Sequence, residues 1–201
     1  MTDADGDVER LTASDLAGRV RRAVAEPFEI VEYDPRWPAV FEAEKAHLLS
    51  VFPEGSVVRI EHVGSTAVPG LAAKPIVDIL VGVTDLAPVR ERVAPDLEAQ
   101  GYDYFWSPSH GNDVPPFYAL FIKRAADGAR THHIHVVEMT GFDEQWGWVV
   151  FRDHLRAHPE DAAEYEQLKR RLAREFAGDR VGYTEAKSGF IAEVMRRAAV
   201  G

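Results

Sequence analysis

Apolar side chains recur at helical spacing in the first half of the chain. Asp34 followed by Pro35 is typical of a helix start. Five apolar positions then share one helical face: Trp37, Val40, Phe41, Leu48 and Phe52. A helix is therefore predicted over residues 37–52. A second apolar stripe predicts a helix over residues 85–101, where Gly101 stands at the position of a left-handed terminator.

Runs of β-branched and aromatic residues bounded by turn residues predict four or five strands. These runs cover residues 57–63, 76–83, 102–106, 117–124 and 130–139. A short segment with Asp127-Gly128 separates the last two runs, which is typical of a β-hairpin. Strands joined first by a helix and then by a hairpin favour a mixed sheet.

From residue 143 onward the pattern is helical, with runs that end near Pro159, near Gly178 and at the end of the chain. Strands followed by helices predict the α+β class: a mixed sheet of four or five strands with flanking helices and a C-terminal helical cap. Residues 26–201 are predicted to form a single domain. Residues 1–25 are predicted to form a mobile arm or a loosely docked helix that takes no part in the chemistry.

Composition and charge narrow the classes of function. The 201 residues are 46% hydrophobic and 28% charged, as is usual for a globular domain. The 23 basic and 33 acidic residues give a net charge of −10, which disfavours long nucleic acid as a partner. A small anionic ligand stays compatible, because the local field of a pocket can oppose the net charge. Without cysteine, any metal must be held by His, Asp or Glu. No apolar run is long enough to span a membrane and the N-terminus is acidic, so we expect a cytoplasmic protein without a membrane partner.

A turn with small polar residues carries the first candidate chemistry. Gly64, Ser65 and Thr66 lie between two predicted strands. Glycine lets the backbone approach a ligand closely, and hydroxyl and amide groups bind phosphate oxygens. These three residues are therefore predicted to bind phosphate. The alternative is a plain turn with a Ser or Thr cap, and the segment matches neither the P-loop nor the GxGxxG pattern.

Asp78 is a carboxylate within an otherwise apolar strand. Val77 and Ile79 point to one face of the strand, which leaves Asp78 on the other. A buried carboxylate without a partner is costly, so it requires a cation, hydrogen-bond donors or water. A structural salt bridge, for example to Lys74, is the alternative to a catalytic or metal-binding role.

Two histidines strengthen the case for a metal. His133 and His135 are two positions apart on a predicted strand, so their side chains share one face. Together with Asp78 and Glu61 on neighbouring strands they are the predicted metal ligands, and the two carboxylates are also predicted catalytic groups. Oxygen and imidazole ligands together suit Mn²⁺, Zn²⁺, Fe²⁺ or Ni²⁺, whereas Mg²⁺ prefers oxygen alone.

Three cationic side chains are candidates to offset the charge of a phosphorylated ligand. Lys74 and Lys187 are predicted to bind the phosphate or nucleotide, and Arg152 is predicted to take part in catalysis. For Lys187, as for Lys169, the spacing by itself favours an ordinary surface position.

Residues 28–198 resemble the GrpB family, also called the UPF0157 family. The segments that carry the resemblance are "EYDPRWPAVFEAEKAHL", "RIEHVGSTAVPGLAAKPIVDILV", "RTHHIHVV", "FRDHLRAHPE" and "YTEAKSGFI". That family is similar to the nucleotidyltransferase superfamily of DNA polymerase β, which implies a nucleotidyltransferase-like fold, a nucleotide substrate and Mg²⁺ or Mn²⁺ as cofactor. In some actinobacteria a domain of this kind is fused to dephospho-CoA kinase, which implies a functional link to that enzyme.

The chain departs from the superfamily pattern in its carboxylates. The pattern has Gly-Ser at the end of one strand, Asp-x-Asp on the next and a third acidic residue on a later strand. Gly64-Ser65 match the first element and Asp78 takes the place of the second aspartate, but Ile76 stands in place of the first. A histidine of "RTHHIHVV" stands where the third carboxylate belongs. Two magnesium ions are normally held by these carboxylates, so replacement ligands are required, and Glu61 and His62 are the candidates.

Three functions follow from these observations. The leading hypothesis is a metal-dependent, nucleotidyltransferase-like enzyme that acts on a nucleotide or another phosphorylated small molecule. The alternative is a non-catalytic module that binds a nucleotide or a coenzyme A-like ligand and regulates a partner enzyme. A third hypothesis is metal-dependent hydrolysis, with His133 and His135 as ligands.

Overall fold

Five strands form one mixed sheet in the order β1–β2–β5–β4–β3. The computed structural model describes residues 13–106, 118–139 and 143–198. The strands are β1 (Val57–Val63), β2 (Val77–Val83), β3 (Asp103–Trp106), β4 (Tyr118–Arg124) and β5 (Arg130–Glu138). β2 and β5 run parallel, and the other neighbouring strands run antiparallel. The predicted mixed sheet and the α+β class are therefore confirmed.

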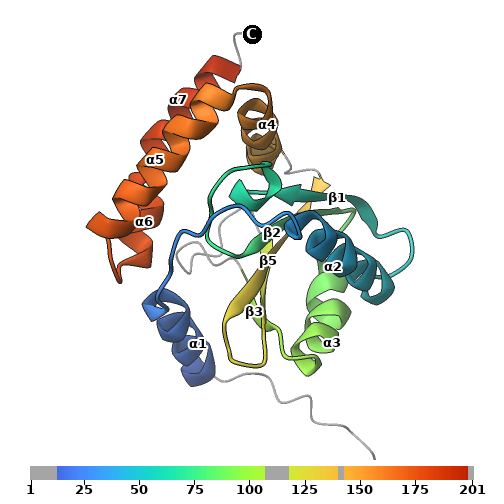
Figure 1. Ribbon diagram of the computed structural model, residues 1–201. Helices are drawn as coiled ribbons and strands as arrows, with labels where there is room; N and C mark the ends of the chain where they lie inside the picture. The colour runs from blue at the N-terminus through green and yellow to red at the C-terminus, as the bar shows by residue number, and fades with distance from the viewer. Residues whose placement is uncertain (1–12, 107–117, 140–142, 199–201) are drawn as a thin grey trace, which may run out of the picture.

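Helices cover both faces of this sheet (Figure 1). They are α1 (Ala13–Ala25), α2 (Trp37–Val51), the short η1 (Ser65–Ala67), the π-helical turn η2 (Val89–Val93), α3 (Ala94–Ala99), α4 (Asp143–Ala157), α5 (Pro159–Glu175), α6 (Arg180–Ala186) and α7 (Ser188–Ala198). In Figure 1, α2 and α3 lie on one side of the sheet and the C-terminal helices lie on the other. None of the described helices combines the length and the apolar character needed to cross a bilayer.

The two faces of the sheet differ in character because side chains alternate along each strand. Ile79 of β2 and Ile134 of β5 are fully buried in the main core, which α2 covers with Phe41. The opposite face carries Asp78 and His133, which the parallel register of β2 and β5 places side by side. The polar face thus looks toward the C-terminal helices.

Most of the predicted elements are confirmed, and two helices differ in form. The helix predicted over residues 85–101 begins as the π-helical turn η2 and ends as α3, and Gly101 has the expected positive φ of 90°. The last predicted helix is interrupted at Lys187, between α6 and α7. Ser188 and Gly189 follow directly, and both have lower helix propensity than alanine.

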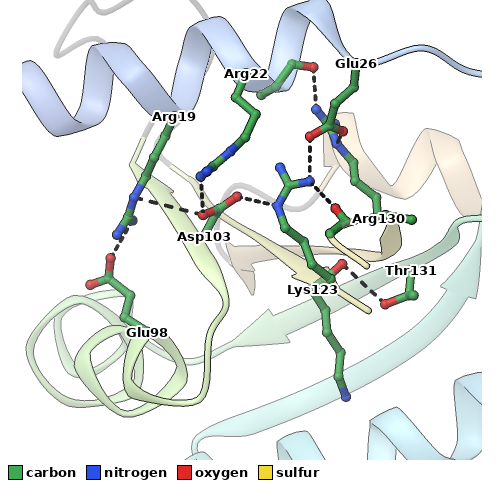
Figure 2. Close-up of polar contacts among 12 residues, drawn as sticks. Arg19, Arg22, Glu26, Glu98, Asp103, Lys123, Arg130 and Thr131 are labelled. Carbon is green, nitrogen blue, oxygen red and sulfur yellow. Dashed lines mark hydrogen bonds and ion pairs between the residues drawn. The ribbon is translucent and has the colours of Figure 1, made fainter. Parts of the chain in front are cut away.

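α1 is docked on the edge of the sheet through ion pairs (Figure 2). Nη1 of Arg19 lies 2.6 Å from Oε1 of Glu98 at the end of α3. Just after α1, the carboxylate of Glu26 accepts a hydrogen bond from Arg130 at the start of β5. Of the two forms predicted for the N-terminal arm, the described part adopts that of a docked helix. The first twelve residues lie outside the described residues.

Candidate functional site

A cavity of about 500 Å³ lies between the polar face of the sheet and the C-terminal helices. Its walls include side chains of β2, β5, α4, α5, α6 and α7, and the turn that leads into η1. Eight of the ten predicted site residues line it: Gly64, Ser65, Thr66, Lys74, Asp78, His133, His135 and Lys187. The fold therefore brings residues from distant parts of the sequence to one hollow.

Asp78, His133 and His135 form a group with the geometry of a metal site. Each offers a ligand atom, and these atoms lie within 4.8 Å of one another. Nδ1 of His133 is 3.0 Å from Oδ1 of Asp78. The register causes this proximity, since Asp78 pairs with His133 and the two-residue period of β5 keeps His135 on the same face. Among the described residues, no second group of His, Asp and Glu meets this criterion.

The protonation states of this group suit a divalent cation. Burial alone would raise the pKa of Asp78, but the hydrogen bond with His133 and nearby positive charge lower it overall. Burial lowers the pKa of His135 to about 4, so its imidazole is neutral at neutral pH. Nδ1 of His135 is buried and has no hydrogen-bond partner among the described residues. A carboxylate and a neutral imidazole are the forms that ligate metals.

Gly64 allows the backbone to pass directly over Asp78. Its φ of 71° and ψ of −173° lie in a region that is open only to glycine. A Cβ at this position would lie 2.4 Å from Oδ2 of Asp78. Glycine is therefore required here both for the turn and for the close approach to the carboxylate.

Basic side chains outnumber carboxylates around the cavity, although the chain as a whole carries a net charge of −10. One carboxylate, that of Asp78, is found among the described lining residues. Five cationic side chains line the same cavity: Lys74, Arg130, Lys169, Arg180 and Lys187. This local excess of positive charge favours an anionic ligand.

Burial and mutual repulsion make these cations unstable without an anion. Burial lowers the pKa of Lys74 to about 6, and the charges of Lys187 and Arg180 act in the same direction. Burial lowers the pKa of Lys169 to about 7, again with a contribution from Lys187. The pKa of Arg180 falls to about 10 through burial and the charge of Arg130. A bound anion would reverse these shifts, because it stabilises the charged forms.

Two predicted site residues, Glu61 and Arg152, lie outside the cavity and pair with each other. Nη1 of Arg152 is 2.8 Å from Oε2 of Glu61 and 2.7 Å from the carbonyl of His62. Glu61 also accepts a hydrogen bond of 2.7 Å from Arg59. Glu61 shares the face of Asp78, but it is paired with Leu80, one row further along the sheet. The structure thus places Glu61 apart from the group of Asp78, His133 and His135, and Arg152 supports the end of β1.

The hydroxyl of Thr66 is used within the turn. Thr66 is 1% exposed, and its Oγ1 lies 3.0 Å from Nε2 of His62. His62 faces the main core, where its ring stacks on Phe41 at 4.9 Å. Thr66 therefore fixes the shape of the turn, while Gly64 and Ser65 lie at the cavity beside it.

Sequence reasoning missed Arg130 and Arg180 and left Lys169 as a surface lysine. Lys169 is in fact 2% exposed, with its ammonium bound to the carbonyl of Ala72. A usable signal existed for α6, because Arg180 and Tyr183 are three residues apart and share a helical face. Arg130 carried no such signal, since its position is set by Glu26, from a distant part of the sequence.

Comparisons with known proteins agree with this architecture. The model of the GrpB protein family matches residues 27–197. A UPF0157 protein of Pseudomonas aeruginosa is 40% identical over 170 residues, which span 85% of this chain and 67% of that protein. A UPF0157 protein of Halalkalibacterium halodurans is 37% identical over 169 residues, which span 84% of this chain and 81% of that protein.

A solved structure and a longer protein are also similar. The crystal structure of the conserved protein GrpB from Enterococcus faecalis matches with a TM-score of 0.74 and 31% identity, over 85% of this chain and 96% of that one. A dephospho-CoA kinase of Mycolicibacterium paratuberculosis is 30% identical over 197 residues, which span 89% of this chain but 47% of that protein. The resemblance seen in the sequence is confirmed, and the chain belongs to the GrpB family, also named UPF0157.

Proposed function

We propose that this protein is a metal-dependent enzyme that transfers a nucleotidyl group from a nucleotide to an acceptor. The observation that carries the proposal is the meeting of Asp78, His133 and His135 with a cluster of cationic side chains in one cavity. A metal site alone, or a cationic pocket alone, would fit many functions. Their combination fits chemistry at a phosphoryl centre, where negative charge must be neutralised on several oxygens.

Asp78, His133 and His135 would hold the divalent ion. The donor set is one oxygen and two nitrogens, which favours Mn²⁺ or Zn²⁺ over Mg²⁺. Nδ1 of His135, which has no partner among the described residues, supports this assignment, because a buried polar atom without a hydrogen bond destabilises a folded protein. When bound, such an ion polarises phosphoryl oxygens and offsets their charge.

The other residues of the cavity would bind and orient the nucleotide. Lys74 and Lys187 would neutralise phosphate charge, and Gly64 and Ser65 would approach the phosphate through the turn. In the transfer, the acceptor hydroxyl forms a bond to the α-phosphorus while the bond from that phosphorus to the bridging oxygen breaks. Pyrophosphate leaves, and the hydroxyl proton passes to a base, for which Asp78 is the candidate because it is the ionised carboxylate in the cavity.

An exposed aromatic side chain favours a ligand that contains a ring. Trp148 of α4 lines the cavity and is 40% exposed. Its ring meets that of His135 edge to face, with centroids 4.7 Å apart. Large exposed aromatic surfaces in a pocket are suited to stacking on a nucleobase. Trp148 therefore supports a nucleotide over a phosphorylated ligand without a ring.

Calorimetry with Mn²⁺ and Zn²⁺ tests the metal site. Asp78→Asn should lower Mn²⁺ affinity by at least about tenfold, because a charged ligand is lost. Asp96→Asn, which changes an exposed carboxylate of α3 in the same way, should leave the affinity unchanged. Equal affinities in both variants would remove Asp78 from the metal site.

Labelled nucleotides test the reaction itself. The wild-type chain, incubated with nucleoside triphosphates labelled in the α-phosphate, Mn²⁺ and cell extract, should transfer label to an acceptor and release pyrophosphate. Release of inorganic phosphate without transfer of label would indicate hydrolysis instead. The Asp78→Asn chain serves as the control for contaminating activity.

A non-catalytic binding module is the second candidate. Ile76 is 6% exposed and apolar, and it occupies the place of the first aspartate in the nucleotidyltransferase pattern. Regulation of dephospho-CoA kinase is the partner function that this candidate suggests, since a protein of that name contains a similar segment. Thermal stabilisation by a nucleotide or coenzyme A, with no labelled product under any metal, would favour this candidate over the enzyme.

A further inference from the structure

Three cations of the cavity are gathered on one pair of aromatic rings. Phe28 and Tyr183 lie with their ring centroids 4.6 Å apart. The ammonium of Lys74 is 4.2 Å from the ring centroid of Phe28 and 4.1 Å from that of Tyr183. Lys187 lies 4.6 Å from the centroid of Tyr183, and the guanidinium of Arg180 lies 5.7 Å from that of Phe28. We refer to Lys74, Arg180 and Lys187 as the cationic trio.

The cationic trio has no carboxylate of its own. None of its three members forms an ion pair within 4.0 Å with the described residues. Nε of Arg180 is buried and has no hydrogen-bond partner in the described part of the chain. Aromatic faces offset part of the charge, but less than an anion would. Three buried basic side chains this close together cannot all stay charged without a counterion, so an anion would complete the arrangement.

Other charged groups around the trio add to the excess of positive charge. Arg130 and Lys169 also line the cavity, and the charge of Arg130 acts on both Lys74 and Arg180. The opposing charges are those of Asp78, which faces all three members, and of Glu26, which faces Arg180. Glu26 is already bound to Arg130.

Two members of the trio and Trp148 belong to different parts of the C-terminal helices. Arg180 and Lys187 belong to α6 and its end, close to α1, whereas Trp148 belongs to α4, at the other end of the C-terminal helices (Figure 1). His133 contacts Arg130 at 3.3 Å, and His135 contacts Trp148. His133 and His135 thus lie between Trp148 and Arg130, the charge of which acts on Lys74 and Arg180.

We infer that Lys74, Arg180 and Lys187 form a second anion subsite, which binds the terminal phosphates of a ligand with at least two linked phosphate groups. This inference rests on the proposed function for its chemistry and names the substrate class. One phosphate carries about two negative charges near neutral pH, which a divalent ion alone would balance. The cationic trio can therefore neutralise the charge of at least one further phosphate group. In a nucleotidyl transfer, this subsite holds the pyrophosphate that leaves.

Binding of inorganic pyrophosphate without metal tests the subsite directly. Calorimetry is done on the full chain with a chelator present and at fixed ionic strength, because salt screens such contacts. The wild type should bind pyrophosphate more tightly than phosphate. Arg180→Gln should weaken pyrophosphate binding by about tenfold, since a charge-assisted contact is lost. Arg196→Gln, which removes the same charge from the exposed face of α7, should bind as the wild type does.

Two results would overturn the inference. One is unchanged pyrophosphate affinity in Arg180→Gln; the other is equal affinity of the wild type for phosphate and pyrophosphate. If Arg180→Gln does not fold, Lys187→Gln replaces it with the same expectation. The result is separable from the metal proposal, because Asp78→Asn should keep metal-free pyrophosphate binding while it loses Mn²⁺. A wild type that binds pyrophosphate but not Mn²⁺ would refute the proposal of a metal-dependent enzyme. It would still support the anion subsite.

Discussion

The backbone of Gly64 lies so close to Asp78 that the two residues form one structural unit. A Cβ on Gly64 would lie 2.4 Å from Oδ2 and 3.1 Å from Cγ of Asp78. The position of the carboxylate is thus limited on one side by the turn and on the other by His133, whose Nδ1 is 3.0 Å away. The glycine of the turn therefore shapes the proposed metal site, whether or not it also contacts phosphate.

Gly64→Ala should lower stability and displace Asp78. We expect a loss of about 2–4 kcal/mol in the free energy of unfolding, from the positive φ and from the clash. Chemical denaturation measures the loss, and Mn²⁺ affinity should fall with it. Gly70→Ala is the matched control, since Gly70 has a φ of 79° with nothing within 4 Å of its Cβ position. Equal losses in both variants would show that the clash with Asp78 contributes nothing.

Lys74→Met should stabilise the protein, most strongly at low pH. The pKa of Lys74 is about 6 in the folded chain, below the ordinary value of 10.5 for lysine. Between these two values the unfolded wild type binds more protons than the folded one, so wild-type stability rises with pH. The advantage of methionine should therefore be largest at pH 6 and shrink toward pH 9, by up to about 1.4 kcal/mol per pH unit.

Urea denaturation of both chains at pH 6, 7.5 and 9 measures this trend. An advantage that stays constant with pH would mean that Lys74 keeps an ordinary pKa in the fold. A simultaneous loss of pyrophosphate affinity in Lys74→Met would show that the unfavourable burial serves ligand binding.

Glu61→Gln should affect stability and leave the metal site intact. Arg152 is 7% exposed and would lose one of its anionic partners, although Asp153 would remain 2.8 Å from its Nε. We expect a loss of about 1–2 kcal/mol, as for a weakened partly buried ion pair. Thermal denaturation and Mn²⁺ calorimetry measure the two effects. A fall in Mn²⁺ affinity as large as that expected for Asp78→Asn would instead show that Glu61 is a metal ligand.

His135→Phe should separate metal binding from folding. The ring is replaced by one of similar shape, and a buried nitrogen without a partner is removed, so stability should hold or rise by up to about 1 kcal/mol. Affinity for Zn²⁺ should fall by at least about tenfold because a ligand is lost. His47→Phe, on α2 and outside the cavity, should retain the metal. Retained Zn²⁺ affinity in His135→Phe would exclude the imidazole as a ligand.

Local patterns were sufficient to predict the sheet and the meeting of Asp78 with the histidines. The two-residue period of a strand fixes which side chains share a face. That period alone predicts that His133 and His135 lie on the same face of the sheet. The parallel register of β2 and β5, which the structure shows, brings Asp78 beside them. The helix boundaries depended on caps and glycines, which are also local signals.

The period of a strand could not distinguish Glu61 from a metal ligand. Glu61 and Asp78 lie on one face of the sheet but in different rows, and the row is decided by the register of β1 against β2. The fate of Glu61 depends further on Arg152, which α4 delivers from 91 positions away. The cavity positions of Lys169 and Arg180 were not predicted for a similar reason, because the orientation of the C-terminal helices is set by tertiary packing as well as by their own periodicity.

Glu26 has a practical consequence for work on this family. It lies one position before the segment that matches the GrpB family, yet its carboxylate holds the guanidinium of Arg130, which in turn contacts His133. A recombinant chain begun at residue 27 would lose this carboxylate together with the carbonyl of Ala23, the other anchor of Arg130. Ligand screens on such a shortened protein would test a cavity in which Arg130 has lost both anchors. Any preparation used to search for the substrate should therefore include α1 and Glu26.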